Sequence, residues 1–112
     1  MKPEIYTPSF GGYQVMHRYE GWRIAYLTYA EIFDKITYLE KHNETDEIFV
    51  LLEGSAELIF NEDRECMTME KDKIYNVPKG MWHNVKVSRD AVLLIFENEN
   101  TSKENSDYIY FE

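Results

Sequence analysis

Four side chains in the middle of the sequence have the types and the spacing to bind a metal ion or to exchange protons. Glu40 and His42 are followed, after a short polar turn, by Glu47, and His83 comes after the Pro78-Lys-Gly80 turn. Alternate residues of a β-strand share a face, so Glu40 and His42 are expected to point the same way. If the strand that starts at Glu47 pairs back antiparallel, these three side chains would meet within one hairpin. The later turn would bring His83 to them on another strand.

Two neutral imidazoles and one carboxylate can bind Mn, Fe, Zn, Ni or Co and leave positions open for water or substrate. We therefore predict a divalent metal site formed by His42, Glu47 and His83, with Glu40 as a fourth ligand or as an acid or base beside the metal. A second carboxylate would favour Mn(II) or Fe(II). Two alternatives stay open: a hydrogen-bonded histidine–carboxylate pair without metal, and metal-free acid–base chemistry on a sugar.

The residues around this group predict short β-strands rather than helices. Runs rich in aromatic and β-branched residues recur with turn signals between them, and no segment has a helical period. The nearly continuous apolar runs are typical of strands covered on both faces. The spacing predicts an all-β sandwich or barrel. Strands are expected at 15–19, 22–30, 36–42, 47–53, 56–60, 66–69, 73–77, 82–87, 91–97 and 108–111.

The two ends of the sequence differ from its centre. Residues 1–14 contain two prolines and two glycines, which indicates an irregular arm that wraps the domain or reaches a partner subunit. Residues 98–107 are polar, but the aromatic residues after them favour burial, so a loop should bring a last strand back onto the domain. We expect one domain over 1–112, with a core at about 22–97, an N-terminal arm at 1–14 and a C-terminal cap at 98–112.

Composition and charge limit the classes of function. The chain has 112 residues and a net charge of −9, and its cationic residues are scattered, so nucleic acid is not an expected partner. No apolar run approaches the roughly 20 residues that cross a bilayer, and no secretion signal is visible, so we expect a cytoplasmic protein without a membrane partner. Cys66, the single cysteine, is expected to be a reduced structural thiol, and His17 a histidine outside the site.

The spacing of the candidate residues resembles the two motifs of the cupin superfamily. The first motif is a glycine, five residues, His-x-His, three or four residues, a glutamate, six residues and a glycine. Here His42 takes the second histidine position, and Glu47 and Gly54 follow at matching distances. The two motifs with the strands between them span about residues 36–97, most of the chain. The resemblance implies a double-stranded β-helix, or jelly-roll, barrel.

The second cupin motif is a glycine, five residues, Pro-x-Gly, two residues, a histidine, three residues and an asparagine. It is matched by Pro78, Gly80 and His83. Three positions depart from the two motifs: Glu40 replaces the first histidine, Asp72 the opening glycine of the second motif, and Val87 its closing asparagine. Only the first departure falls where the family supplies a metal ligand. The resemblance therefore supports the fold more strongly than the metal.

The resemblance also implies a class of function. It suggests a small-molecule-binding barrel with a divalent metal (Mn, Fe, Ni or Zn) and, for an enzyme, isomerisation of a sugar or organic acid or dioxygen insertion at Fe(II). The alternative is a non-catalytic ligand-binding or sensing barrel with a degenerate, metal-free site, which Glu40 favours. Small cupins commonly pair sheet to sheet, so a homodimer is expected, with the N-terminal segment exchanged between subunits.

Overall fold

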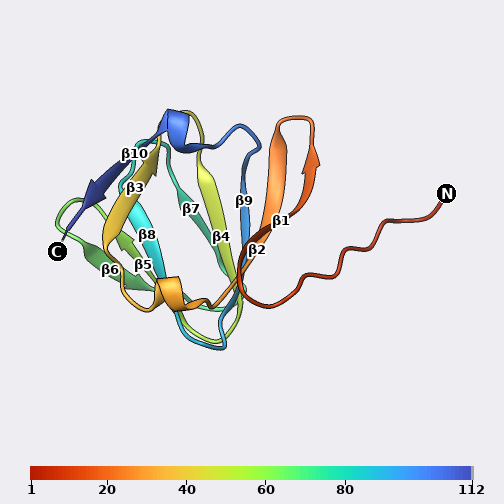
Figure 1. Ribbon diagram of the computed structural model, residues 1–112, viewed down its shortest axis with the longest axis horizontal. Helices are drawn as coiled ribbons and strands as arrows, with labels where there is room; N and C mark the ends of the chain where they lie inside the picture. Colours follow the sequence, from red (N-terminus) through yellow and green to blue (C-terminus); the bar gives the residue numbers. More distant parts are fainter. Residues whose placement is uncertain (112) are drawn as a thin grey trace.

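Two antiparallel five-stranded sheets face each other in the computed structural model, which describes residues 1–111 (Figure 1). The first sheet has the order β1 (Gly12–Tyr19), β2 (Trp22–Thr28), β9 (Val92–Asn98), β4 (Glu47–Glu53) and β7 (Ile74–Val77). The second has the order β10 (Ser106–Tyr110), β3 (Tyr38–His42), β8 (His83–Val87), β5 (Ala56–Phe60) and β6 (Glu65–Thr68). Short 3-10 helices at Glu31–Phe33 and Lys103–Asn105 lie in connections. The all-β fold predicted from the sequence is confirmed.

Buried and more exposed residues alternate along the strands, so each sheet has an inner and an outer side. On β9, Leu93, Ile95 and Glu97 are buried, whereas the residues between them are half-buried. The inner side chains of both sheets meet in one apolar core. Burial of one aliphatic side chain contributes about 1.5–3 kcal/mol, so this core holds the sheets together. The core includes Ala25, Leu27, Phe49, Leu51, Leu58, Val85, Leu93 and Ile95.

Strands that follow one another around the site lie in different sheets. β3 pairs with β8 and β10, whereas β4 pairs with β7 and β9. The hairpin considered for 36–42 with 47–53 is therefore wrong. β4 does not pair with the next strand, β5, either, because β5 pairs with β6 and β8. The physical reason is that residues 43–46 can span up to about 13 Å, enough to cross the roughly 10 Å between packed sheets.

The connection after β4 needs a glycine. Gly54 has a φ of +74°, and a Cβ there would lie 2.6 Å from the Cα of Ala91. A side chain would therefore be strained by its backbone conformation and would also collide with the chain before β9. The glycine lets the β4–β5 and β8–β9 connections close one end of the barrel together.

Both ends of the chain differ from the sequence-based expectation. β1 begins at Gly12, so only residues 1–11, called the N-terminal arm below, precede the first sheet, and they extend away from the body (Figure 1). At the other end, β10 begins at Ser106, inside the segment expected to be a loop, and pairs with β3. Among residues 1–111, no helix is long and apolar enough to cross a membrane.

Candidate metal centre

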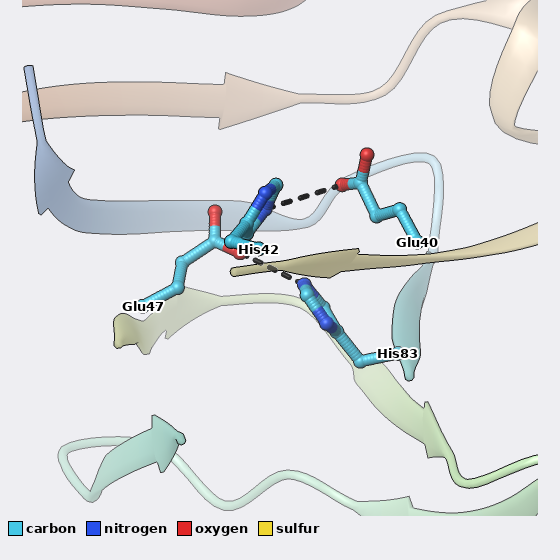
Figure 2. A group of neighbouring side chains, drawn as sticks. All are labelled: Glu40, His42, Glu47 and His83. Carbon is cyan, nitrogen blue, oxygen red and sulfur yellow. Dashed lines mark hydrogen bonds and ion pairs between the residues drawn. The ribbon is translucent and has the colours of Figure 1, made fainter. Parts of the chain in front are cut away.

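All four candidate ligands lie together inside the barrel, where Figure 2 shows their polar ends converging. Glu40 and His42 alternate on β3, and His83 begins the neighbouring strand β8 with its Cα opposite that of Glu40. Glu47 begins β4 in the facing sheet. One ligand atom from each residue lies within 4.8 Å of the other three. The group is therefore assembled across the interior, from both sheets.

Glu47 is the centre of this group. Its Oε1 lies 2.8 Å from Nε2 of His83 and 3.2 Å from Nε2 of His42. Oε1 of Glu40 lies 3.7 Å from Nε2 of His42. Glu47 and both histidines are buried, and Glu40 is half-buried. Both Nε2 atoms and both carboxylates thus face one small volume.

The other nitrogen of each imidazole is anchored by a neighbour. Nδ1 of His83 lies 3.0 Å from the carbonyl oxygen of Met81, which can only accept, so this nitrogen carries a hydrogen. Nδ1 of His42 lies 2.8 Å from Oγ of Ser106 on β10. A hydrogen on Nδ1 leaves the Nε2 lone pair directed at the centre of the group. Such outer contacts orient histidines that bind metals.

The buried Nε2 of His42 has no hydrogen-bond partner among the described residues. Its 3.2 Å separation from Glu47 is short, but the geometry is not that of a hydrogen bond. A buried polar atom without a partner costs about 1–3 kcal/mol. The cost would be removed by a cation, because at metal–ligand distances near 2.1 Å neighbouring ligand atoms lie about 3 Å apart. The donor set and its spacing therefore fit a divalent transition metal.

Charges within the group shift its pKa values. Burial lowers the pKa of His42 and of His83, but the Glu47 carboxylate outweighs burial and raises both overall. Burial raises the pKa of Glu47, yet the two imidazoles outweigh burial and hold it well below its usual range. Without a metal, the ionised Glu47 carboxylate therefore favours proton binding by the two histidines. A divalent cation would replace these protons.

Sequence reasoning did not identify Glu97, which lies opposite Glu47 on the neighbouring strand β9. Its Oε1 accepts hydrogen bonds from Tyr13, at 2.5 Å, and from Nη2 of Arg23, at 2.8 Å. Burial, followed by the charge of Glu47, raises the pKa of Glu97. The signal was available in the sequence, since a carboxylate ends the inward-facing series Leu93, Ile95, Glu97 of a strongly apolar strand.

The group opens into a cavity of about 410 Å³. Its wall combines the four candidate ligands with aromatic side chains, among them Phe33, Tyr38, Phe49 and Tyr108. Cavities of roughly 300–1,000 Å³ with a few convergent polar groups are typical of small-molecule sites. His17 lies outside this cavity, between Tyr6 and Trp22. Cys66 lies apart from it as well, as an exposed free thiol on β6.

No protein-family model and no curated protein matches the sequence. Solved structures do match the fold. A cupin-2 domain containing protein from Shewanella frigidimarina has a TM-score of 0.66 at 18% identity, covering 83% of this chain and 85% of that one. Streptomyces Pac13 with uridine has a TM-score of 0.69 at 8% identity, covering 99% and 93%. KdgF from a Halomonas species has a TM-score of 0.62 at 11% identity, covering 80% of each chain.

These matches cover 80–99% of the chain, and because every identity is at most 18%, they show a common fold alone. The strand order also fits a jelly-roll barrel, because strands that are distant in the sequence are neighbours in both sheets. The expected jelly-roll barrel is confirmed. The chain is therefore a small barrel of the cupin fold.

Proposed function

We propose that the protein binds a divalent transition metal through His42, Glu47 and His83, and a small organic molecule in the cavity beside it. Glu40 is the fourth ligand or an acid or base next to the metal. The observation that carries the proposal is the buried Nε2 of His42, which is aimed at the group and lacks a hydrogen-bond partner among the described residues. Mn, Fe, Ni and Zn all suit two imidazoles with carboxylates.

The chain's own residues would prepare the site before a metal arrives. The carbonyl of Met81 and the hydroxyl of Ser106 hold the two imidazoles with Nε2 facing inward. Glu47 supplies an ionised carboxylate, because its pKa is lowered by the histidines. A bound divalent ion would supply a Lewis acid at the inner end of the cavity. The residues thus provide both orientation and negative charge.

The cavity wall favours a ring-shaped polar ligand. Tyr38 and Tyr108 line the cavity with ring centroids 6.1 Å apart, so the wall carries aromatic surface in addition to the polar groups. Among the proteins of similar fold, Pac13 is described as a nucleoside dehydratase and was solved with uridine. We therefore propose a sugar-like or small organic-acid ligand, and isomerisation or dioxygen insertion as the reactions to test first.

A metal-free binding barrel is the second candidate. The 2.8 Å contact between Nε2 of His83 and Oε1 of Glu47 favours it, because an imidazolium and a carboxylate satisfy each other without a cation. The presence of Glu40 at the position of the first motif histidine also favours it. In this case the cavity would bind a ligand without turning it over.

Elemental analysis of the purified, untagged protein, after incubation with each cation, distinguishes the two candidates. We expect near-stoichiometric metal in the parent protein and in a His17→Ala control, whose histidine lies outside the cavity. We expect loss of metal in the His42→Ala, His83→Ala double variant. Absence of metal from the parent under every condition would overturn the proposal. A sugar or organic acid that raises the melting temperature of that metal-free protein would then favour the second candidate.

We propose that the protein works as a homodimer in the cytoplasm, with no nucleic-acid or membrane partner. The net charge of −9 supports the exclusion of nucleic acid, because phosphates would be repelled. The single cysteine supports a reducing compartment.

A further inference from the structure

The residues of β3 and β10 that face the barrel interior change in character along these two paired strands. Opposite residues of antiparallel strands point to the same side of a sheet, and this side alternates along each strand. Three opposite pairs therefore face the interior together: His42 with Ser106, Glu40 with Tyr108, and Tyr38 with Tyr110. The first pair lies at the candidate metal centre, and the last pair consists of two aromatic rings.

The accessibility of these pairs rises in the same order. His42 is 7% exposed and Ser106 is 8% exposed, whereas Tyr110 is 73% exposed. Glu40 and Tyr108, in the middle pair, are half-buried. β10 is the edge strand of the second sheet and ends at the periphery of the barrel (Figure 1). The inner side of this sheet thus begins at the buried candidate ligands and becomes open surface at Tyr110.

Three tyrosines on this inner side lie against one another. The ring centroid of Tyr38 is 6.1 Å from that of Tyr108 and 5.7 Å from that of Tyr110. The rings of Tyr108 and Tyr110 are stacked, with centroids 6.3 Å apart and planes 24° apart. Tyr38, Tyr108 and Tyr110 are called the tyrosine cluster below. Because Tyr38 and Tyr108 line the cavity, the cluster continues the aromatic wall of the cavity onto the exposed surface.

Packing within the protein does not account for the aromatic ring of Tyr110. Hydrophobic stabilisation is proportional to the apolar area removed from water, so a side chain that is 73% exposed contributes little to folding. An edge strand that faces water is served as well by a charged or polar residue. An exposed ring beside a cavity is instead free to pack against a ligand.

The three pairs extend over the length of two linked rings. Two residues along a strand cover about 6.6 Å, so the pair of Tyr38 with Tyr110 lies about 13 Å along the strands from the pair of His42 with Ser106. A six-membered ring fills roughly one of these two steps. A ligand with one ring near the candidate metal centre therefore places a second ring at Tyr110.

We propose that the tyrosine cluster is a second ligand subsite and that the ligand is a glycoside of two linked rings. A sugar ring occupies the cavity, and a second ring packs its flat face on Tyr110. This second ring is a sugar or an aromatic group, because both present a flat face to an aromatic side chain. The inference rests on the small-molecule site proposed above, but it does not depend on whether a metal is bound.

Dissociation constants of matched probes with one ring and with two rings test the subsite. The probes are the methyl glycosides of glucose and galactose, the phenyl glycosides of the same sugars, and the disaccharides cellobiose and lactose. Titration calorimetry and saturation-transfer NMR measure their binding to the protein as purified. We expect at least one probe with two rings to bind about fivefold more tightly than the methyl glycoside of its sugar. An advantage of the phenyl glycosides alone would identify an aromatic second ring, and an advantage of the disaccharides alone a sugar.

Variants of Tyr110 assign this advantage to the tyrosine cluster. Tyr110→Ala should reduce the affinity for the probes with two rings to that for the methyl glycosides. Tyr110→Phe retains the ring and should retain most of the advantage. Tyr6→Ala, at an exposed tyrosine of the N-terminal arm, is the matched control and should bind every probe as the parent does. Both positions are exposed, so the variants are expected to fold, and circular dichroism checks this.

Equal affinities for probes with one ring and with two rings in the parent protein would overturn the proposal. So would an advantage that Tyr110→Ala retains, or the absence of binding by every probe. Elemental analysis of the same samples separates these results from the proposed metal site. A protein that contains metal but gains no affinity from a second ring would have the metal site without the subsite. A metal-free protein with the full advantage would have the subsite alone.

Discussion

Glu47 and Glu97 lie directly opposite each other on β4 and β9, so two buried carboxylates share the polar end of the barrel interior. Like charges at such positions destabilise a sheet unless they are compensated. Glu47 is compensated by two imidazoles, and Glu97 by Arg23 and Tyr13. Arg23 also donates to the carbonyl oxygens of Glu99 and Thr101. The two carboxylates are thus compensated by residues from both sheets, and carbonyl oxygens of the loop after β9 help to hold Arg23 in place.

Replacement of Arg23 should test whether Glu97 needs its cation. Arg23→Leu leaves Glu97 buried without its cation, and we expect the free energy of unfolding to fall by about 3 kcal/mol at neutral pH. Urea unfolding measures the change. The Arg23→Leu, Glu97→Gln double variant should recover about half of the loss, because no unpaired carboxylate remains. A single variant as stable as the parent would show that the ion pair is not needed.

Removal of the Ser106 hydroxyl should weaken metal binding without removing a ligand. Ser106 contacts Nδ1 of His42, so Ser106→Ala frees the imidazole to rotate, and we expect the metal dissociation constant to rise at least tenfold. Titration calorimetry with the metal found by elemental analysis measures this. Ser55→Ala, at an exposed serine outside the cavity, is the control and should bind as the parent does. Equal affinities of all three proteins would contradict an orienting role for Ser106.

The metal-free protein should lose histidine-dependent stability as the pH rises. The folded-state pKa values of His42 and His83 are raised by Glu47, so their contribution is complete below the ordinary value of 6.5 and is lost as the pH rises through the folded values. The pKa of Glu47 is lowered, so its contribution is complete above the ordinary value of 4.5 and is lost in acid.

The difference in unfolding free energy between the parent and the His42→Ala, His83→Ala variant isolates this effect. Without metal, the difference should be largest between about pH 4.5 and 6.5 and should shrink at higher pH. Added metal should reverse the trend, because metal binding requires deprotonated imidazoles. A difference that stays constant from pH 5 to pH 9 would mean that the cluster carries no extra proton.

Gly54→Ala should destabilise the barrel more than Gly80→Ala. Both glycines have positive φ angles, but only at Gly54 would a Cβ collide with backbone, that of Ala91 at 2.6 Å. We expect a loss of about 3 kcal/mol for Gly54→Ala and about 1 kcal/mol for Gly80→Ala, where the added Cβ would have no atom within 4 Å apart from those of Gly80 and its two chain neighbours. Thermal and urea unfolding compare the two. Equal losses would show that the collision is relieved by a small backbone shift.

The sequence predicted the fold well because strand periodicity and turn residues are local signals. Alternation on β9 and the Pro78–Gly80 turn were visible in the sequence and lie where expected. The pairing partners were not predictable in the same way. The hairpin expected for β3 and β4 is wrong because pairing depends on which distant strands, here β8 and β9, occupy the neighbouring edges.

The candidate site was predictable only in part. The spacing of Glu40, His42, Glu47 and His83 singled them out, and the structure brings them together. Glu97 and Arg23 were not identified, because their contacts join β9 to β2, strands far apart in the sequence. Ser106 was missed for a similar reason, since it lies in a segment that reads as a polar loop. A carboxylate on the inner side of an apolar strand is the signal worth following in similar sequences.

Adjacent residues of β4 and β9 face opposite sides of one sheet. Glu47 and Glu97 face the cavity, whereas Ile48 and Phe96 face outward. A shift of either strand would therefore move side chains in the cavity and on the outer side of the sheet together. In the proposed homodimer, a subunit contact on this outer side would make occupancy of the cavity and subunit association linked equilibria, and linkage is reciprocal. Ligand affinity would then depend on protein concentration, and the monomer–dimer equilibrium on the ligand.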